Sequence, residues 1–290
     1  MRFKDILYSE RNPIRPLFWD GIFAEKCFQA ILGYQLRMMD FILLVYKELI
    51  NVLDSHGYSF QPFGFFLENP ASNVVILRHD VDKLPVNALK MAMLEHDLGV
   101  KASYFFRAVS ESFDEGIIRQ IGTLGHEVGY HYEDLSLAGG DPQKAIRHFE
   151  VQLTRFRRIY PVKTICMHGS PLSRHDNRDL WKHYDYRDWG IIGEPYFDVN
   201  FKEVFYITDT GRKWNNESVS VRDRVASGFD IRIKNTFHLI ALAEQCVLPD
   251  QMMITVHPQR WNEFGVRWIK ELVGQNIMNV AKAALIKIRG

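Results

Sequence analysis

Residues 74–82 read VVILRHDVD, and this stretch decides the fold class of the chain. Its first four residues are branched and apolar, a short uninterrupted run typical of a strand buried on both faces of a parallel sheet. The run then ends in four polar residues, Arg78, His79, Asp80 and Asp82. Functional sites of parallel α/β folds lie at the C-terminal ends of the strands, so charge at this strand end indicates a site.

Strands and helices alternate along the rest of the chain. Further strands are predicted at 102–107, 126–131, 163–169, 203–211 and 252–258. Helices are predicted at 38–54, 85–99, 113–125, 141–160, 234–246 and 263–288. This alternation predicts a parallel sheet, open or closed. We expect one α/β domain over residues 38–290, with a helical N-terminal extension, residues 1–37, packed on it.

Composition limits the classes of partner. Lys and Arg total 36 against 35 for Asp and Glu, so the strong net positive charge that nucleic-acid binding favours is absent from the sequence as a whole. Three cysteines without a CxxC pair argue against a disulfide framework and favour a reducing compartment. Charges interrupt the most apolar stretch, and the N-terminus has no signal-peptide core. We therefore expect a cytoplasmic protein that does not insert into a membrane and acts on a small molecule; the oligomeric state stays open.

Polar residues follow several predicted strands at the point where each strand ends. Besides residues 78–82 these are His131, Glu133, Asp134, His168, Asp209 and His257. Imidazole and carboxylate suit a divalent ion such as zinc, with three protein ligands and one open position in a catalytic site. With a carboxylate as base and a histidine as acid nearby, this set predicts metal-assisted hydrolysis.

Three motifs, RHDVD, GHEVGYH and ITVHPQRW, resemble those of the polysaccharide deacetylases of carbohydrate esterase family 4, the chitooligosaccharide deacetylase-like proteins. The HDVD form resembles a branch associated with bacterial O-antigen and surface-glycan loci. The likeness covers roughly residues 38–265. It implies a distorted (β/α)7 barrel of the glycoside hydrolase/deacetylase type, which removes an N-acetyl group from an amino sugar through a bound metal ion.

Matched motif by motif, the resemblance implies a role for individual residues. Asp80 corresponds to the general base, Asp82 to the first metal ligand and His131 to a histidine ligand. His257 corresponds to the general acid. The stretch TDTGRKW resembles a motif that lines the site and supports the catalytic groups, which places Asp209 and Trp214 there.

The chain also departs from the family pattern. Leu135 stands four residues after His131, where the family has a second histidine ligand, so His168, Glu133 or Asp134 must replace it. We prefer His168, because imidazole preserves the ligand chemistry. The arginine of the family's third motif, which pairs with the base, is also missing.

The sequence thus predicts a metal-dependent hydrolase of C–N bonds other than peptide bonds. It would remove an N-acyl group from an amino sugar, free or linked to a nucleotide or lipid, in surface polysaccharide or lipopolysaccharide biosynthesis. The expected ion is zinc, with cobalt, nickel or manganese as alternatives. Expected substrate-binding residues are Arg78, Glu133, Trp214 and Arg260. Alternatives are an inactive glycan-binding or scaffold protein, and hydrolysis of another small N-acyl or cyclic amide.

Overall fold

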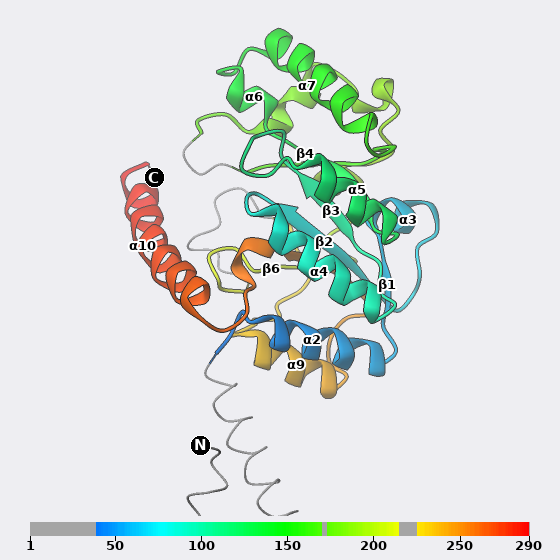
Figure 1. The fold of residues 1–290 in the computed structure, drawn as a ribbon, viewed down its shortest axis with the longest axis vertical. Helices are drawn as coiled ribbons and strands as arrows, with labels where there is room; N and C mark the ends of the chain where they lie inside the picture. The colour runs from blue at the N-terminus through cyan, green and yellow to red at the C-terminus, as the bar shows by residue number, and fades with distance from the viewer. Residues whose placement is uncertain (1–38, 170–172, 215–224, 290) are drawn as a thin grey trace, which may run out of the picture. The chain divides into compact units, whose positions relative to one another are not determined.

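The computed structural model describes residues 39–169, 173–214 and 225–289, with side chains up to residue 280. The predicted N-terminal extension, residues 1–37, lies outside the described residues. Seven strands form one parallel sheet. Figure 1 shows the sheet with helices packed around it. The strands are β1 (Ser59–Gln61), β2 (Val74–Val81), β3 (Ser103–Phe106), β4 (Glu127–Tyr132), β5 (Ile165–Met167), β6 (Phe205–Thr208) and β7 (Gln251–Val256).

The strand order explains why residues 74–82 lie at the centre. The sheet runs β5-β4-β3-β2-β7-β6, and β1 also pairs with β2. Every pairing is parallel, so all strands end at the same side of the sheet. Within the described residues the edge strands β5 and β6 do not pair with each other. The prediction of a distorted α/β barrel is confirmed.

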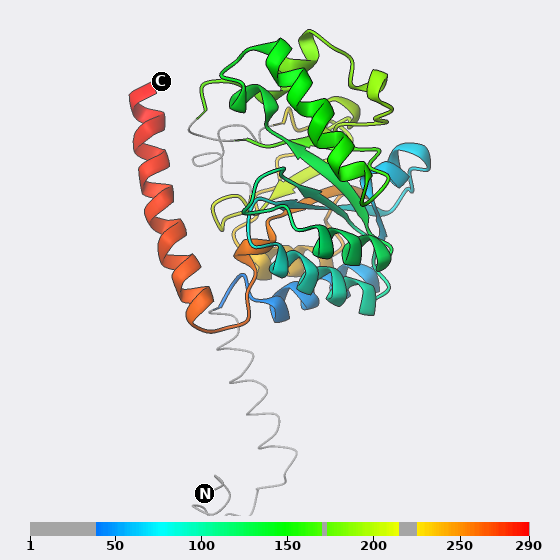
Figure 2. The same cartoon turned by 45° about the horizontal axis from the view of Figure 1, so that its top comes forward.

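Helices connect and flank the strands. They are α2 (Leu43–Ser55), α3 (Phe63–Glu68), α4 (Pro85–Asp97), α5 (Glu115–Thr123), α6 (Asp134–Leu137), α7 (Pro142–Arg157), α8 (Pro195–Asp198), α9 (Thr236–Glu244) and α10 (Val266–Arg289). Three short 3₁₀ segments are η2 (Asn177–Lys182), η3 (Tyr186–Trp189) and η4 (Pro258–Arg260). Helices α4 and α5 pack side by side against β2 and β4 (Figure 2), and α2 packs on α9. None of the described helices combines the length and apolarity needed to cross a bilayer.

Strand alternation gives β2 two chemically different faces. Its even-numbered residues Val74 and Ile76 belong to the core cluster that also contains Phe105 and Cys166. His79 lies on the opposite face, where its Nε2 is 2.7 Å from Oε1 of the buried Glu95 of α4. Two tyrosine hydroxyls donate to the same carboxylate, Tyr46 at 2.5 Å and Tyr104 at 2.7 Å. Because Glu95 satisfies these buried groups together, His79 ties α4 to the sheet and stays outside the site.

A buried carboxyl group beside β5 predicts a pH-dependent stability. Glu194 is fully buried and accepts hydrogen bonds from the backbone N–H of Met167 (3.0 Å) and of Tyr196 (2.7 Å). Burial raises the pKa of Glu194 from 4.5 to about 7, although those two bonds and Arg78 oppose the shift. Between these values the unfolded chain releases a proton that the folded chain retains, so the stability is fully present below pH 4.5 and falls as pH rises to about 7.

The loss amounts to about 3 kcal/mol for a shift of this size. Urea denaturation of the wild type and of Glu194→Gln at pH 5 and pH 8 measures it. We expect the wild type to lose stability relative to the variant at the higher pH. An unchanged difference between the two proteins at both pH values would contradict the assignment.

Candidate metal centre and active site

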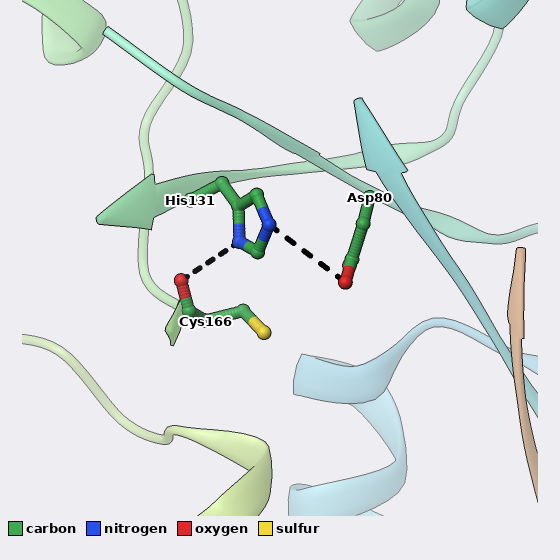
Figure 3. Close-up of side chains that lie close together, drawn as sticks. All are labelled: Asp80, His131 and Cys166. Carbon is green, nitrogen blue, oxygen red and sulfur yellow. Dashed lines mark hydrogen bonds and ion pairs between the residues drawn. The ribbon is translucent and has the colours of Figure 1, made fainter. Parts of the chain in front are cut away.

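The parallel strands bring most of the predicted residues to one place. Asp80 and His131 lie within their strands β2 and β4, and His168 and His257 directly follow β5 and β7. The close-up in Figure 3 shows Asp80 and His131 directed toward each other, with Oδ2 of Asp80 3.8 Å from Nε2 of His131. His257 Nε2 lies 3.9 Å from Oδ2 of Asp82. Predicted ligands, base and acid therefore surround a common point.

Three donor atoms form a compact triangle there. His168 Nδ1 lies 3.2 Å from Asp82 Oδ1 and 3.2 Å from His131 Nε2, and the third side, His131 Nε2 to Asp82 Oδ1, is 3.6 Å. Zinc bonds of 2.0–2.2 Å in tetrahedral geometry place neighbouring donors about 3.3 Å apart. Oδ1 of Asp82 is buried and makes no hydrogen bond to any described residue. The triangle thus has the size and the unsatisfied acceptor that a divalent ion requires.

In His131 and Asp82, the side-chain polar atom that does not face the triangle already has a hydrogen-bond partner. Nδ1 of His131 is 3.0 Å from the carbonyl oxygen of Cys166 (Figure 3), so Nδ1 carries the proton and Nε2 is left as a lone-pair donor. The amide of Gln259 donates to Asp82 Oδ2 at 2.9 Å, which leaves Oδ1 to face the histidines. Such outer contacts fix the direction of metal ligands, and the residues present fit a divalent ion.

A second triplet shares one of these donors. Asp80, His131 and Cys166 also each offer a ligand atom within 4.8 Å of the other two (Figure 3). Both oxygens of Asp80, however, accept hydrogen bonds from Arg78, at 2.8 and 2.6 Å. The set of Asp82, His131 and His168 is therefore the better candidate.

The alternatives for the third ligand separate clearly. Asp134 is fully buried and turned away: it accepts from the hydroxyl of Tyr130 and contacts Nδ1 of His148 at 2.5 Å. Glu133 binds Arg107 instead and lies outside the triangle. The geometry brings His168, the third ligand preferred from the sequence, to the other two ligands, and its role as a ligand stays a prediction.

Arg78 pairs with the candidate base. Its guanidinium is fully buried and forms a two-point ion pair with Asp80, two residues along the same strand. Burial alone would raise the pKa of Asp80, but attraction by Arg78 and His131 holds that pKa below its usual value. Asp80 is thus an ionised, oriented carboxylate. Arg78, predicted to bind substrate, is placed to position the base.

A similar arrangement orients the candidate acid. Asp209 lies 2.6 Å from Nδ1 of His257 and also accepts from Nη1 of Arg260 (2.6 Å) and from the indole of Trp261 (2.8 Å). Burial favours the neutral form, yet attraction by Arg260 and His257 lowers the pKa of Asp209 to about 2. The ionised Asp209 fixes the ring of His257 with Nε2 toward the centre. Arg260, also predicted to bind substrate, is 6% exposed, and its guanidinium stabilises the charge of Asp209.

The structure does not bring Trp214 to the centre. Its indole N–H donates to Thr236 at 3.0 Å, and its ring packs against Phe41 and Trp261 at centroid distances of 6.2 and 6.3 Å. It is 3% exposed, so it offers no face to a sugar. Its predicted substrate contact finds no support in this geometry.

Sequence reasoning missed two residues of the site, Arg107 and Gln259. Arg107 directly follows β3, and Gln259 lies two residues after His257. The first could have been found by the rule that singled out the other strand ends, because ASYFFR also ends in a charge. Gln259 carried no signal, since a lone glutamine has no distinctive spacing.

Comparisons with family models and with curated proteins gave no match. Solved structures do share similarity. A mutant of a CE4 family pseudoenzyme with restored enzymatic activity is 12% identical (TM-score 0.42), covering 74% of this chain and 65% of that chain. The chain thus spans less than two thirds of that protein. A Streptococcus mutans CE4 esterase is 13% identical (TM-score 0.41; 78% and 86% covered). A mutant of the peptidoglycan deacetylase PdaC from Bacillus subtilis is 12% identical (TM-score 0.37; 76% and 98% covered).

Proposed function

We propose that this chain is a metal-dependent hydrolase that removes an N-acyl group, acetyl first, from an amino sugar. The observation that supports the proposal best is the triangle of Asp82, His131 and His168 with Asp80 and His257 beside it. Metal-assisted hydrolysis of an amide uses a general base to deprotonate water and a general acid to protonate the leaving nitrogen, both beside the metal. The resemblance of RHDVD and ITVHPQRW to deacetylase motifs supports the sugar as substrate.

The chain's own residues divide the reaction between them. A divalent ion held by Asp82, His131 and His168 would supply Lewis-acid polarisation of the acyl carbonyl. Asp80, ionised through Arg78, takes a proton from the water whose oxygen bonds to the acyl carbon. His257, held by Asp209, gives the proton from Nε2 to the sugar nitrogen as the C–N bond breaks. The products are a carboxylic acid and a free amine. Asp80 releases its proton to solvent and His257 takes one up, which returns both residues to their starting states.

The substrate class is part of the proposal. N-acyl amino sugars linked to a nucleotide or lipid, intermediates of bacterial surface-polysaccharide or O-antigen assembly, are the first candidates. Zinc is the proposed ion because two imidazoles and one carboxylate are a common catalytic zinc set; cobalt, nickel or manganese would fit the same donors.

The rival proposal is a barrel that binds glycan without turnover. One observation favours it: Leu135, at the position of the family's second histidine, is buried and 5% exposed, so this position provides no ligand. Activity separates the two proposals, because binding alone releases neither acid nor amine.

The test is release of acid and primary amine from a panel of N-acetyl and N-formyl amino sugars, free and nucleotide-linked. Wild-type protein reconstituted with zinc or cobalt is compared with Asp80→Asn. We expect turnover of at least one N-acetyl sugar, greatly reduced in the variant. If only N-formyl sugars are hydrolysed, the acyl group of the substrate is formyl and the proposed acetyl group is wrong. Ligand binding without turnover by a metal-loaded wild type would favour the rival.

A further inference from the structure

His168 is held by its backbone and reaches the metal centre through one ring nitrogen. Its N–H donates to the carbonyl of Tyr132 at 2.8 Å, and its own carbonyl accepts from the amide of Asn177 at 2.8 Å. Nδ1 faces the triangle. A neutral histidine can coordinate through Nδ1 only if its proton resides on Nε2, so a group beyond the ring must select that tautomer.

Glu133 is the group on the far side of the ring. Its Oε2 lies 3.8 Å from Nε2 of His168, an ion-pair distance longer than a hydrogen bond. The Glu133 residue is 5% exposed, so few other partners can reach this carboxylate. A hydrogen bond of about 2.8 Å needs these two atoms to approach by about 1 Å.

Arg107 fixes Glu133 in that position. Its Nε and Nη2 both lie against Oε1 of Glu133, at 2.8 and 2.6 Å, which leaves Oε2 for His168. Its Nη1 donates to the backbone carbonyl of Asp82 at 3.2 Å. The guanidinium of Arg107, directly after β3, therefore links the segment that carries Asp82 with the carboxylate behind His168.

We propose that Glu133 is a positioning residue, braced by Arg107, that holds the Nε2–H tautomer of His168 and so makes it the third metal ligand. The inference rests on the proposed metal site and goes beyond it. It assigns Glu133 a role other than the substrate contact expected from sequence. It also explains how a histidine directly after β5 can serve as a ligand where Leu135 of α6 cannot. Arg107 and Glu133 act together, and neither touches substrate.

Cobalt(II) is the probe, because its visible spectrum reports the geometry of its ligands without any turnover. Wild type, Glu133→Ala, Arg107→Met, His168→Ala and the control Asp134→Asn are each titrated with cobalt. Asp134 is the matched control, since it is the adjacent, equally buried carboxylate and contacts Tyr130 and His148 instead. Circular dichroism verifies that each variant is folded.

We expect Glu133→Ala and Arg107→Met to bind cobalt about 10–100-fold more weakly than wild type and with an altered spectrum, and Asp134→Asn to match wild type. If both Glu133→Ala and Arg107→Met bind cobalt with wild-type affinity and spectrum, the positioning role of Glu133 and Arg107 is wrong, while the proposed metal site is unaffected. Tight binding by His168→Ala with none by Glu133→Ala would also overturn it, because Glu133 would then be the ligand. No cobalt bound by the wild type would overturn the proposed function itself.

Discussion

Replacing Asp80 by asparagine is expected to lower kcat by about 10²–10⁴-fold, the contribution of a positioned acid–base group, while metal content stays at the wild-type level. Asparagine has nearly the shape of aspartate but cannot take a proton. Arg78 keeps one oxygen acceptor in the variant but loses its counter-charge, so circular dichroism verifies that the variant is folded before its kinetics are compared. Steady-state kinetics on the best substrate of the panel, together with metal analysis of the same samples, measure both quantities.

Asp134→Asn serves as the control here as well, because it makes the same chemical change in a buried carboxylate that lies outside the triangle. It should retain wild-type kcat. Unreduced turnover in Asp80→Asn would remove Asp80 as the base. Loss of the metal in Asp80→Asn would instead favour the second triplet, in which Asp80 is a ligand with His131 and Cys166.

Replacing Arg78 by methionine is expected to lower the free energy of unfolding by about 3–5 kcal/mol, the cost of leaving one partner of a buried ion pair without the other. Both side chains are almost inaccessible, 0% exposed for Arg78 and 4% for Asp80, so water cannot replace the guanidinium. Urea denaturation at pH 7 of wild type and variant measures the difference.

The double variant Arg78→Met with Asp80→Asn decides what causes the loss. If the unpaired carboxylate is responsible, removing its charge recovers a large part of the stability, and the double variant is more stable than Arg78→Met alone. If the double variant is no more stable than the single one, the effect comes from lost packing of the arginine. That result would contradict the role assigned to this ion pair.

The order of strands and helices was largely predictable, because buried strands and amphipathic helices leave strong patterns. Asp141, predicted to cap a helix, accepts from the N–H groups of Gln143 and Lys144 at the start of α7. The structure adds β1 and α3, which were not predicted from the sequence. β1 has three residues, Ser59–Gln61, without an apolar repeat, and it is a strand only because it pairs with β2. Tertiary pairing of this kind leaves no local signal.

The positions of site residues were predictable where strand ends determine them. His131, His168 and His257 lie at or directly after the C-terminal ends of parallel strands, so the sheet brings them together irrespective of the conformation of the loops. The partner of Asp80 was predictable in principle, since residues 78 and 80 share a face of β2. The burial of Trp214 was not, because a motif gives no information on packing around it. The difference between Glu133 and Asp134 depends on the turn after β4, where Glu133 is the N-cap residue of α6 and Asp134 is the first residue of that helix.

The most direct test of the account is elemental analysis of purified protein after reconstitution with zinc, cobalt, nickel or manganese. Wild type is compared with Asp82→Ala, His131→Ala and His168→Ala, and with His148→Ala as a histidine that pairs with an aspartate outside the triangle. The account predicts about one ion per chain in wild type and His148→Ala and loss of the ion in the other three. No bound ion in the wild type under any of these conditions would contradict it.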